Sequence, residues 1–421
     1  MAEPTRESGR ARAGTSGPPG RLRFAVQYLA YRVFSARRLA VLARFLPARS
    51  AVLRERYPLG MQAPEFARQV PADLRSVAGI EKDPAAEAEA AREPLRSLFD
   101  RWPEADEHIH RVGWRNFLRM EPVIRETQRR VLALNSRGPV TAPAPDDDPE
   151  QLTKDVLEYA HSVGLPIVGV AEYDEKYAFE PRRGNEVGDR VVVCFAEQEY
   201  EVTQSLPSLA AYHAAFSTVA EVYRRTELVT EYLRARGYRA RLNNTEDQGV
   251  VIAYAVQAGL GQLGLNGQLL TPQFGSRCRP CTISTNAPLV FGKPVDYGIP
   301  RICDECKICV RRCPSGAIPA RKAVHRGVYK AKIDPARCVP VVAAAHGCAV
   351  CMKVCPIQKY GLDAVLGEWE RSGTVLGKGT DDLEGYWFDG EYFGARKRPK
   401  IPQVWLELGP TVYAEPPRDR R

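Results

Sequence analysis

The sequence of 421 residues contains no apolar run long enough to cross a membrane. A transmembrane helix needs about 18 or more uninterrupted apolar residues, and the apolar stretch at residues 39–46 is broken by Arg44. The pair Arg37–Arg38 before it is only loosely similar to a twin-arginine export signal, because no small-residue cleavage site follows. We therefore expect neither a membrane span nor an export signal.

Signatures of several common catalytic sites are also missing. The chain has no nucleophile elbow, no phosphate-binding P-loop and no HExxH zinc motif. Gly259, Gly261 and Gly264 have the letters of a dinucleotide-binding fingerprint, but they follow an expected helix and not the strand that this fingerprint requires. The absences argue against the enzyme classes that depend on these motifs.

Basic residues are in excess and unevenly placed. The formal net charge is +9, and residues 21–60 contain nine Arg and one Glu. Apolar and basic residues alternate there at helical spacing, which predicts amphipathic helices. A solvated helix face is the simplest interpretation. The alternative is an acidic partner: a nucleic acid, an anionic membrane surface that the segment contacts peripherally, or a redox protein with an acidic face. We favour the solvated face over any one of these partners.

Composition divides the chain into six segments. Its length suits two or three domains of about 150 residues each. The first segment is rich in Gly, Pro, Ser and Arg, and a Pro- and Asp-rich linker follows the helical region. We expect 1–20 disordered, 21–135 helical, 136–150 linker, 151–300 an α/β domain, 301–365 a cysteine-rich domain, and 366–421 an aromatic tail packed on the core.

The α/β domain is expected from alternating helix and strand patterns. The patterns predict helices at 151–163, 208–236 and 249–258, and buried strands at 166–171 and 190–195. Gly164 and Gly237 directly follow two of these helices, where helices commonly end. Helices that alternate with buried strands indicate a layered domain.

Cysteines are concentrated late in the chain. Ten of the eleven lie from Cys278 to Cys355. A long chain with a large core does not need a disulfide framework, so clustered cysteines are typical of metal ligands. Such ligands must stay reduced, which favours a reducing, cytoplasmic compartment. Cys194 falls in an apolar strand and is expected in the core.

Eight cysteines form two motifs that each end in Cys-Pro. The motifs are Cys303-x2-Cys306-x2-Cys309-x3-Cys313 and Cys338-x9-Cys348-x2-Cys351-x3-Cys355. In bacterial ferredoxins the fourth cysteine of such a run binds the other cluster. We therefore expect one [4Fe–4S] cluster on Cys303, Cys306, Cys309 and Cys355, and a second on Cys313, Cys338, Cys348 and Cys351. Two neighbouring clusters suit sequential electron transfer, with a purely structural role as the alternative.

Zinc sites fit these cysteines less well. Zinc motifs usually pair two Cys-x2-Cys units across a loop of about 15–20 residues and lack the Cys-Pro ending. Cys278 and Cys281 form another Cys-x2-Cys, but no further pair completes it. We expect these two to be thiols and not a third metal site.

A glycine-dense stretch precedes the cysteine motifs. Its members are Gly259, Gly261, Gly264, Gly267 and Gly275. Such density indicates either close approach of the backbone to a ligand or tight packing of strands against helices.

The order of these motifs resembles that of the reductive dehalogenases. The segments AGLG at 258–261, TPQFG at 271–275 and STNAPL at 284–289 precede the two cluster motifs in that order. Epoxyqueuosine reductases share the same core, and residues 261–270 resemble them about as well. The resemblance implies an α+β protein with a nitroreductase-like αβα cobalamin-binding core before a two-[4Fe–4S] ferredoxin-like domain. It also implies cobalamin contacts from Gly259, Gly261, Gly264, Asn266, Gly267 and Gly275.

The resemblance further implies a proton donor. Family dehalogenases use a Tyr beside an Arg or Lys, because a nearby cation lowers the Tyr pKa. The family position falls near Val219 here, so Tyr212 and Tyr223 on the same helix face are the candidates, with Arg277 as the cation. A core tyrosine and a surface arginine are the plain alternatives.

Neighbouring polar residues are further candidates. Asn243, Asn244, Glu246 and Asp247 lie where the relatives carry functional polar residues, although a solvated turn explains them equally. Asn286 stands where the family usually has an acid.

Three functions remain open from the sequence. The first is a cobalamin-dependent reductase that takes electrons from a ferredoxin- or flavodoxin-like donor and reduces a small organic, including halogenated, molecule. The second is epoxide reduction, and the third is a cobalamin-free electron-transfer protein. An enzyme is expected to have a large pocket over the cluster held by Cys313, Cys338, Cys348 and Cys351.

Overall fold

The computed structural model describes residues 145–174, 187–243, 250–325, 328–334 and 345–401, with shorter pieces at 130–131, 133–135, 137, 140, 177, 337–338 and 341–342. The expected disordered segment 1–20 and the basic helices that begin at residue 21 lie outside these residues. The α/β domain, the cysteine-rich segment and the first part of the tail are described.

A four-stranded sheet forms the centre of the α/β domain. Its strands are β1 (Ile167–Glu172), β2 (Arg190–Glu197), β3 (Ala240–Asn243) and β6 (Cys278–Thr285). They lie in the order β1-β2-β6-β3, and each neighbouring pair is antiparallel. The expected strands at 166–171 and 190–195 are confirmed as β1 and β2.

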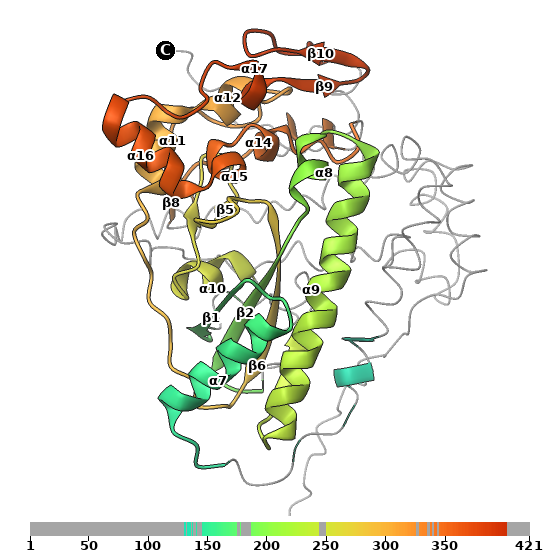
Figure 1. Ribbon diagram of the computed structural model, residues 1–421, viewed down its shortest axis with the longest axis vertical. Coiled ribbons are helices and arrows are strands. Elements are labelled where there is room, and N and C mark those ends of the chain that lie inside the picture. The colour runs from blue at the N-terminus through green and yellow to red at the C-terminus, as the bar shows by residue number, and fades with distance from the viewer. Residues whose placement is uncertain are drawn as a thin grey trace, which may run out of the picture.

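Helices cover both faces of this sheet (Figure 1). On one face, α7 (Pro149–Ser162) and α9 (Leu209–Ala235) bury residues such as Leu152 and Val222 against the strands. On the other face, α10 (Val251–Gln257) buries Ala253 and Val256. The expected αβα layering is therefore confirmed.

Local sequence sets the ends of these helices. Asp148 Oδ2 accepts the Gln151 N–H at 2.8 Å, and Pro149 fills the first helical position of α7. Ser208 Oγ accepts the Ala211 N–H at 3.1 Å at the start of α9. Gly237, with φ of +94°, follows its end. The three predicted helices are confirmed to within two residues at each end.

The cysteine-rich segment folds into short helices. These are α11 (Ile299–Cys306), α12 (Ile308–Arg312), α14 (Val350–Lys353), α15 (Pro356–Tyr360) and α16 (Leu362–Ser372), with a hairpin of β7 (Ala323–His325) and β8 (Val328–Lys330). Buried aliphatic residues from several helices, including Ile299, Val350 and Ile357, share one core with Cys306, Cys348 and Cys355.

The described part of the tail packs on this segment. It forms α17 (Asp381–Glu384) and a hairpin of β9 (Tyr386–Phe388) and β10 (Glu391–Phe393). Leu383, Tyr386, Phe388 and Phe393 are buried in the same core as the cysteines. The tail is therefore part of the cysteine-rich unit.

The two units meet at one end of the sheet, at the top of Figure 1. Two small elements lie at this junction, α8 (Tyr200–Gln204) and a hairpin of β4 (Gln262–Leu263) and β5 (Leu269–Leu270). Gln204 Nε2 donates to Gln358 Oε1 at 3.1 Å, and the Leu362 N–H donates to the Pro272 carbonyl at 2.9 Å. The cysteine-rich unit is thus bonded directly to loops of the α/β domain.

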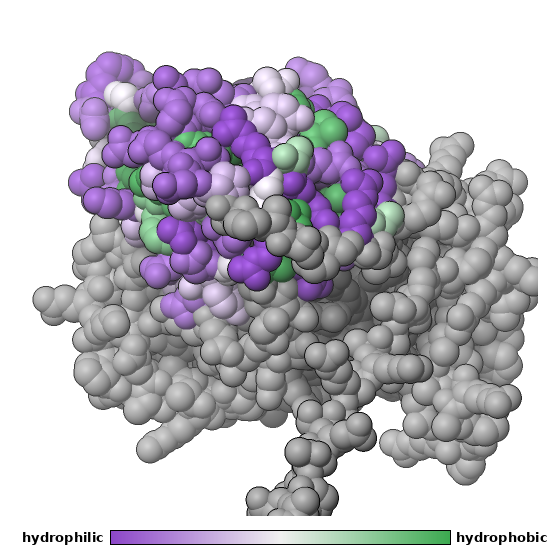
Figure 2. All heavy atoms as spheres, turned by 90° about the horizontal axis from the view of Figure 1, so that it is seen from below, coloured by the Kyte–Doolittle hydropathy of each residue, from purple (hydrophilic) through white to green (hydrophobic). Residues whose placement is uncertain are grey.

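Figure 2 shows the end of the molecule opposite the cysteine-rich unit, where hydrophilic side chains predominate among the described residues, with smaller hydrophobic patches between them. Among the helices that the structure describes, none combines the length and apolar character that a membrane crossing requires.

Candidate iron–sulfur and cofactor sites

The two cysteine motifs share one backbone geometry. The residue after the second cysteine of each four-cysteine motif, Lys307 or Ala349, has a left-handed conformation with φ of 50° or 54°. Each of these residues begins a short helix that carries the next cysteine, Cys309 or Cys351. A left-handed residue other than glycine costs about 1 kcal/mol or more. Its recurrence at equivalent positions indicates that the turn serves the cysteines.

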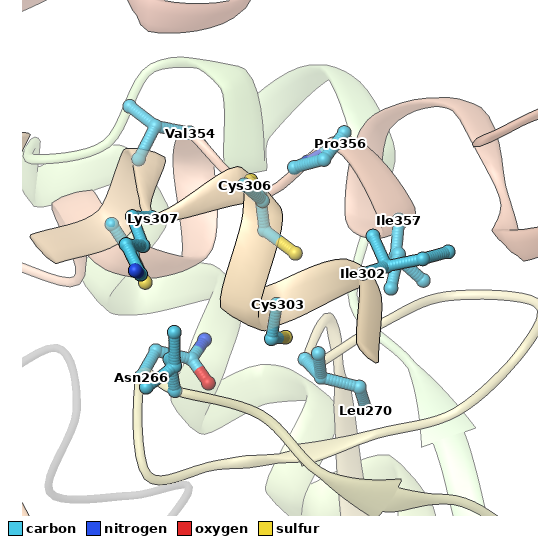
Figure 3. A pocket seen from close by; sticks show the side chains of 12 residues that line it. Asn266, Leu270, Ile302, Cys303, Cys306, Lys307, Val354, Pro356 and Ile357 are labelled. Carbon is cyan, nitrogen blue, oxygen red and sulfur yellow. The ribbon is translucent and has the colours of Figure 1, made fainter. Parts of the chain in front are cut away.

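Four cysteines surround one pocket at the junction (Figure 3). They are Cys303, Cys306, Cys309 and Cys355, the four that the spacing assigns to the first cluster. Leu265, Asn266 and Leu270 from the β4–β5 hairpin close one side, and Ile302, Val354 and Ile357 close others. The lining is almost wholly apolar apart from the sulfurs, which suits an iron–sulfur cluster with thiolate ligands.

The other four cysteines also gather together. Cys313 packs against Cys338 and Cys351 in a small apolar cluster with Ala317 and Ile318. Cys348 lies near enough to Cys338 and Cys313 for their charges to raise its pKa further after burial. Cys351, of the second set, is also close enough to Cys309, of the first set, for its charge to raise the pKa of Cys309 further after burial. The structure thus brings the eight cysteines together in the two expected, adjacent sets.

Burial makes these thiols hard to ionise without metal. It raises the pKa of Cys303, Cys306 and Cys338 to about 12. Cluster ligands are thiolates, so the positive charge of bound iron has to offset this cost. Backbone N–H groups also help, since Leu265 donates to Cys303 and Ala317 donates to Cys313 Sγ at 3.3 Å.

Two buried cations tie the tail to the cluster segment. Arg312 is 1% exposed and donates to the carbonyls of Glu384, Phe393, Ala395 and Lys397. Lys353, 5% exposed, donates to the carbonyls of Leu383 at 3.0 Å and Gly385. Burial lowers the pKa of Lys353 to about 8. Sequence reasoning missed both residues, although both lie within the cluster motifs.

The glycine-dense stretch is packed against the protein itself. A Cβ on Gly259 would lie 2.4 Å from the Lys293 carbonyl oxygen, and one on Gly261 would lie 2.4 Å from the Leu270 carbonyl oxygen. A Cβ on Gly275 would lie 2.8 Å from the Gln358 backbone. Of the two expected explanations, tight packing therefore accounts for these glycines, and close approach to a ligand is not needed.

Gly264, Asn266 and Gly267 belong to the same packing. A Cβ on Gly264 would meet Asn266 Oδ1 and the Leu270 side chain at 2.7 Å, and one on Gly267 would lie 3.1 Å from Ile333. Asn266 Oδ1 accepts the Gln268 N–H at 3.2 Å, and the residue lines the first-cluster pocket. These residues shape the hairpin that covers the first cluster.

The two candidate tyrosines lie in different places. Tyr223 is 3% exposed and packs in the core between α9, α7 and the sheet. Tyr212 lies in the first turn of α9 beside Gly347 and Phe216, close to the cysteine-rich segment. Burial raises the pKa of Tyr212. Eleven residues of helix separate the two by about 16 Å, so both cannot serve one site.

Arg277 is buried, so the alternative interpretation of an ordinary surface arginine is wrong. It is 5% exposed, and its Nη1 donates to the Glu197 carboxylate and to the Gln198 carbonyl at 2.7 Å. Its guanidinium stacks on Tyr200 and Phe274. The tyrosine beside the candidate cation is thus Tyr200, which no sequence pattern had marked as a candidate.

Several buried polar atoms toward this end of the sheet have no partner among the described residues. They are Gln198 Oε1, Ser276 Oγ, Arg277 Nε and, at the end of β3, Asn243 Oδ1. Leaving such an atom unpaired costs about 1–3 kcal/mol. A polar cofactor at this end of the sheet would satisfy them, so these residues fit a bound group. Asn244, Glu246 and Asp247 lie outside the described residues.

Three other expectations have clear outcomes. Cys278 and Cys281 are buried in the cores on opposite faces of the sheet, so they cannot bind one metal. Cys194 is buried opposite Cys281, as expected for a core residue. Asn286 Oδ1 accepts the Arg239 N–H at 2.7 Å and links β6 to β3.

The expected pocket over the second cluster stays a prediction, and two features of the described residues bear on it. The β4–β5 hairpin of the α/β domain lies against the first cluster, where it lines the pocket and bonds Cys303. Beside the second cluster segment lies an open cleft lined by Tyr200, Gln204, Lys353, Asp382 and Trp387. The α/β domain therefore contacts both cluster segments. The hairpin covers the first, and Ala211 and Tyr212 of α9 pack against Met352 and Gly347 of the second.

Comparison with known proteins agrees with this geometry. Residues 302–359 match the model of the 4Fe-4S dicluster domain. The tetrachloroethene reductive dehalogenase of Sulfurospirillum multivorans is 32% identical over 237 residues, which is 52% of this chain and 44% of that protein. The epoxyqueuosine reductase of Lactococcus garvieae is 33% identical over 125 residues, 26% of this chain and 32% of that protein.

Solved structures show the same fold. The catabolic reductive dehalogenase NpRdhA superposes with a TM-score of 0.54 at 18% identity, covering 72% of this chain and 50% of that one. The chain spans less than half the length of the curated dehalogenases it matches. With its two [4Fe–4S] clusters, the chain is a relative of the reductive dehalogenases in sequence and in fold.

Proposed function

We propose that the chain is an oxidoreductase that passes electrons through its two clusters to a cobalamin, which reduces a small organic, including halogenated, substrate. The observation that carries this proposal is the contact between the β4–β5 hairpin and the first cluster. Leu265 donates its N–H to Cys303, and Asn266 and Leu270 line the same pocket. Electrons on this cluster therefore lie at the boundary of the α/β domain.

The cofactor would bind at the end of the sheet that faces the cysteine-rich unit. Asn243, Gln198, Ser276 and Arg277 have the unpaired buried atoms that would hold its polar groups. A bound cobalamin would supply a low-potential, nucleophilic cobalt centre for attack on the substrate. We further infer that the αβα core is of the nitroreductase-like kind, since the relatives combine such a core with two clusters.

Tyr212 is the better of the two proposed proton donors. It lies at the end of α9 that faces the cysteine-rich segment, whereas Tyr223 is enclosed by α7 and the sheet. Arg277, held by Glu197, contributes a fixed positive charge at this end of the domain. Its role is to stabilise anionic groups on a substrate or cofactor.

Two other functions each have one supporting observation. Epoxide reduction is supported by the likeness to the epoxyqueuosine reductase of Lactococcus garvieae. A cobalamin-free electron-transfer protein is supported by the glycines, whose missing Cβ positions are filled by the chain itself.

The test is anaerobic reconstitution of the iron–sulfur protein with cobalamin, followed by removal of unbound cofactor. The proposal predicts about one cobalt per chain beside about eight irons. Arg277→Met should reduce cobalt retention, and Tyr212→Phe should lower turnover of a halogenated phenol more than Tyr223→Phe. Intact clusters without retained cobalt would leave the electron-transfer protein as the better account.

A further inference from the structure

A basic surface lies beside the second cluster. We use this name for the exposed cations Arg337, Arg396, Lys397 and Arg398. Two of them converge on one glycine, because a Cβ on Gly316 would lie 3.6 Å from Nη1 of both Arg337 and Arg398. Arg337 Nη1 also donates to the Gly316 carbonyl at 3.2 Å. Cations this close repel each other, so their proximity favours an anionic partner.

The glycine between these cations is hydrogen-bonded to Cys313, an expected ligand of the second cluster. The Gly316 N–H donates to the Cys313 carbonyl at 3.2 Å, and the next N–H, from Ala317, donates to Cys313 Sγ at 3.3 Å. Arg337 directly precedes Cys338, another ligand of the same cluster. The cations are therefore separated from the second cluster by only one layer of backbone.

The buried Arg312 holds the rest of the surface in place. It donates to the carbonyls of Phe393 at 2.9 Å, Ala395 at 3.2 Å and Lys397. Tyr386 donates its hydroxyl to the Arg312 carbonyl at 2.9 Å from the same tail. The strand end and the basic run after it are thus fixed next to Cys313, and their side chains are left to the solvent.

Among the described residues, two acids lie close to the basic surface. The Asp381 carboxylate accepts the Ala395 N–H at 2.7 Å, and Asp334 lies three residues before Arg337. Four cations against these two acids leave a positive excess in this described part of the molecule.

The β4–β5 hairpin covers the first cluster on its α/β side, where the exposed cation in the pocket lining is Lys307. We propose that the basic surface docks an acidic one-electron carrier protein, with a ferredoxin- or flavodoxin-like surface, which reduces the second cluster. One electron leaves the reduced carrier and enters the oxidised cluster, and no bond is made or broken. The inference rests on the electron-carrying role of the clusters in the proposed function, and it does not depend on cobalamin.

The test measures reduction of the clusters by rapid mixing with a reduced acidic ferredoxin or flavodoxin. Arg396→Glu combined with Arg398→Glu should lower the second-order rate constant about 10-fold or more at low ionic strength. Added salt should slow the wild type toward the variant, because salt screens charge attraction. Iron content and reduction by excess dithionite should stay unchanged, which shows that the clusters themselves are intact.

A matched control carries the same change of charge elsewhere. Lys154→Glu combined with Lys293→Glu reverses two exposed cations of the α/β domain and should keep the wild-type rate. Equal slowing by both double variants, or none by either, would overturn the proposal. It would also be overturned if Arg396→Gln with Arg398→Gln left the rate of carrier oxidation unchanged at low ionic strength. Cluster reduction is measured without cobalamin. A negative result in this experiment would therefore overturn the docking surface without testing whether the protein binds cobalamin.

Discussion

The guanidinium of Arg277 lies 5.2 Å from the ring centroid of Tyr200, although 77 residues separate them in the chain. The contact exists because β2 and β6 are paired in antiparallel register, with Glu197 opposite Cys278. The end of β2 and the beginning of β6 therefore meet, and Arg277 can reach Glu197, Gln198 and Tyr200 together. This group lies at the end of the sheet that faces the clusters.

Replacing Arg277 should affect stability as well as cofactor binding. Arg277→Met removes a buried cation that bonds Glu197 and the Gln198 carbonyl. Glu197 is partly exposed, so we expect a loss of about 2 kcal/mol, below the usual cost of breaking a fully buried pair. Arg277→Lys should recover part of the lost stability. Thermal unfolding under anaerobic conditions measures the stability of both variants. An unchanged unfolding midpoint in the Met variant would contradict the buried bond between Arg277 and Glu197.

The ligand partition predicts two different losses of iron. Cys306→Ser should remove the first cluster and Cys351→Ser the second, because these cysteines lie in separate groups. Each variant should fall from about eight to about four irons per chain. Iron and sulfide analysis gives the count, and electron paramagnetic resonance identifies the remaining cluster. Loss of the same signal in both variants would refute the partition.

Gly275 joins the α/β domain to the cysteine-rich unit. It has φ of +55°, and a Cβ there would lie 2.8 Å from the Gln358 backbone. Gly275→Ala should therefore destabilise the protein by more than the roughly 1–2 kcal/mol cost of a left-handed alanine. Gly373→Ala is the matched control, since Gly373 has φ of +68° with nothing within 4 Å of its Cβ position. Equal effects on thermal unfolding would show that the close contact is absent in solution.

Alkaline stability should depend on Tyr238. This buried residue donates to Asp147 Oδ2 at 2.9 Å, and burial followed by this bond raises its pKa to about 12. The folded state thus keeps a proton that the unfolded state releases near pH 10. The resulting stability is complete below pH 10 and is lost as the pH rises toward 12. Tyr238→Phe should flatten the fall in unfolding free energy over this window, and an unchanged slope would exclude Tyr238 as its source.

The clusters are more predictable from the sequence than the cofactor site is. Cysteine spacing is a local property, so the spacing alone predicts both the ligand sets and their interlocking. The contact between Arg277 and Tyr200 depends on strand register, which no local pattern contains. Glycine density marks crowding at Gly261 and Gly275, but it does not reveal whether a ligand or the chain itself fills the space. The burial of Arg312 depends on the carbonyls of the distant tail, so the local sequence does not distinguish it from a surface cation.

The central claim is that electrons leave the protein's clusters through the first one and reach a bound cobalamin. The most direct measurement is a reductive titration of the cobalamin-loaded protein, which follows the cobalt(II) paramagnetic signal together with the cluster signals. We predict that the cobalt(II) signal disappears on reduction of the wild type, and that it persists in Cys306→Ser while the second cluster is still reduced. Equal loss of the cobalt(II) signal in Cys306→Ser and in the wild type would contradict the account.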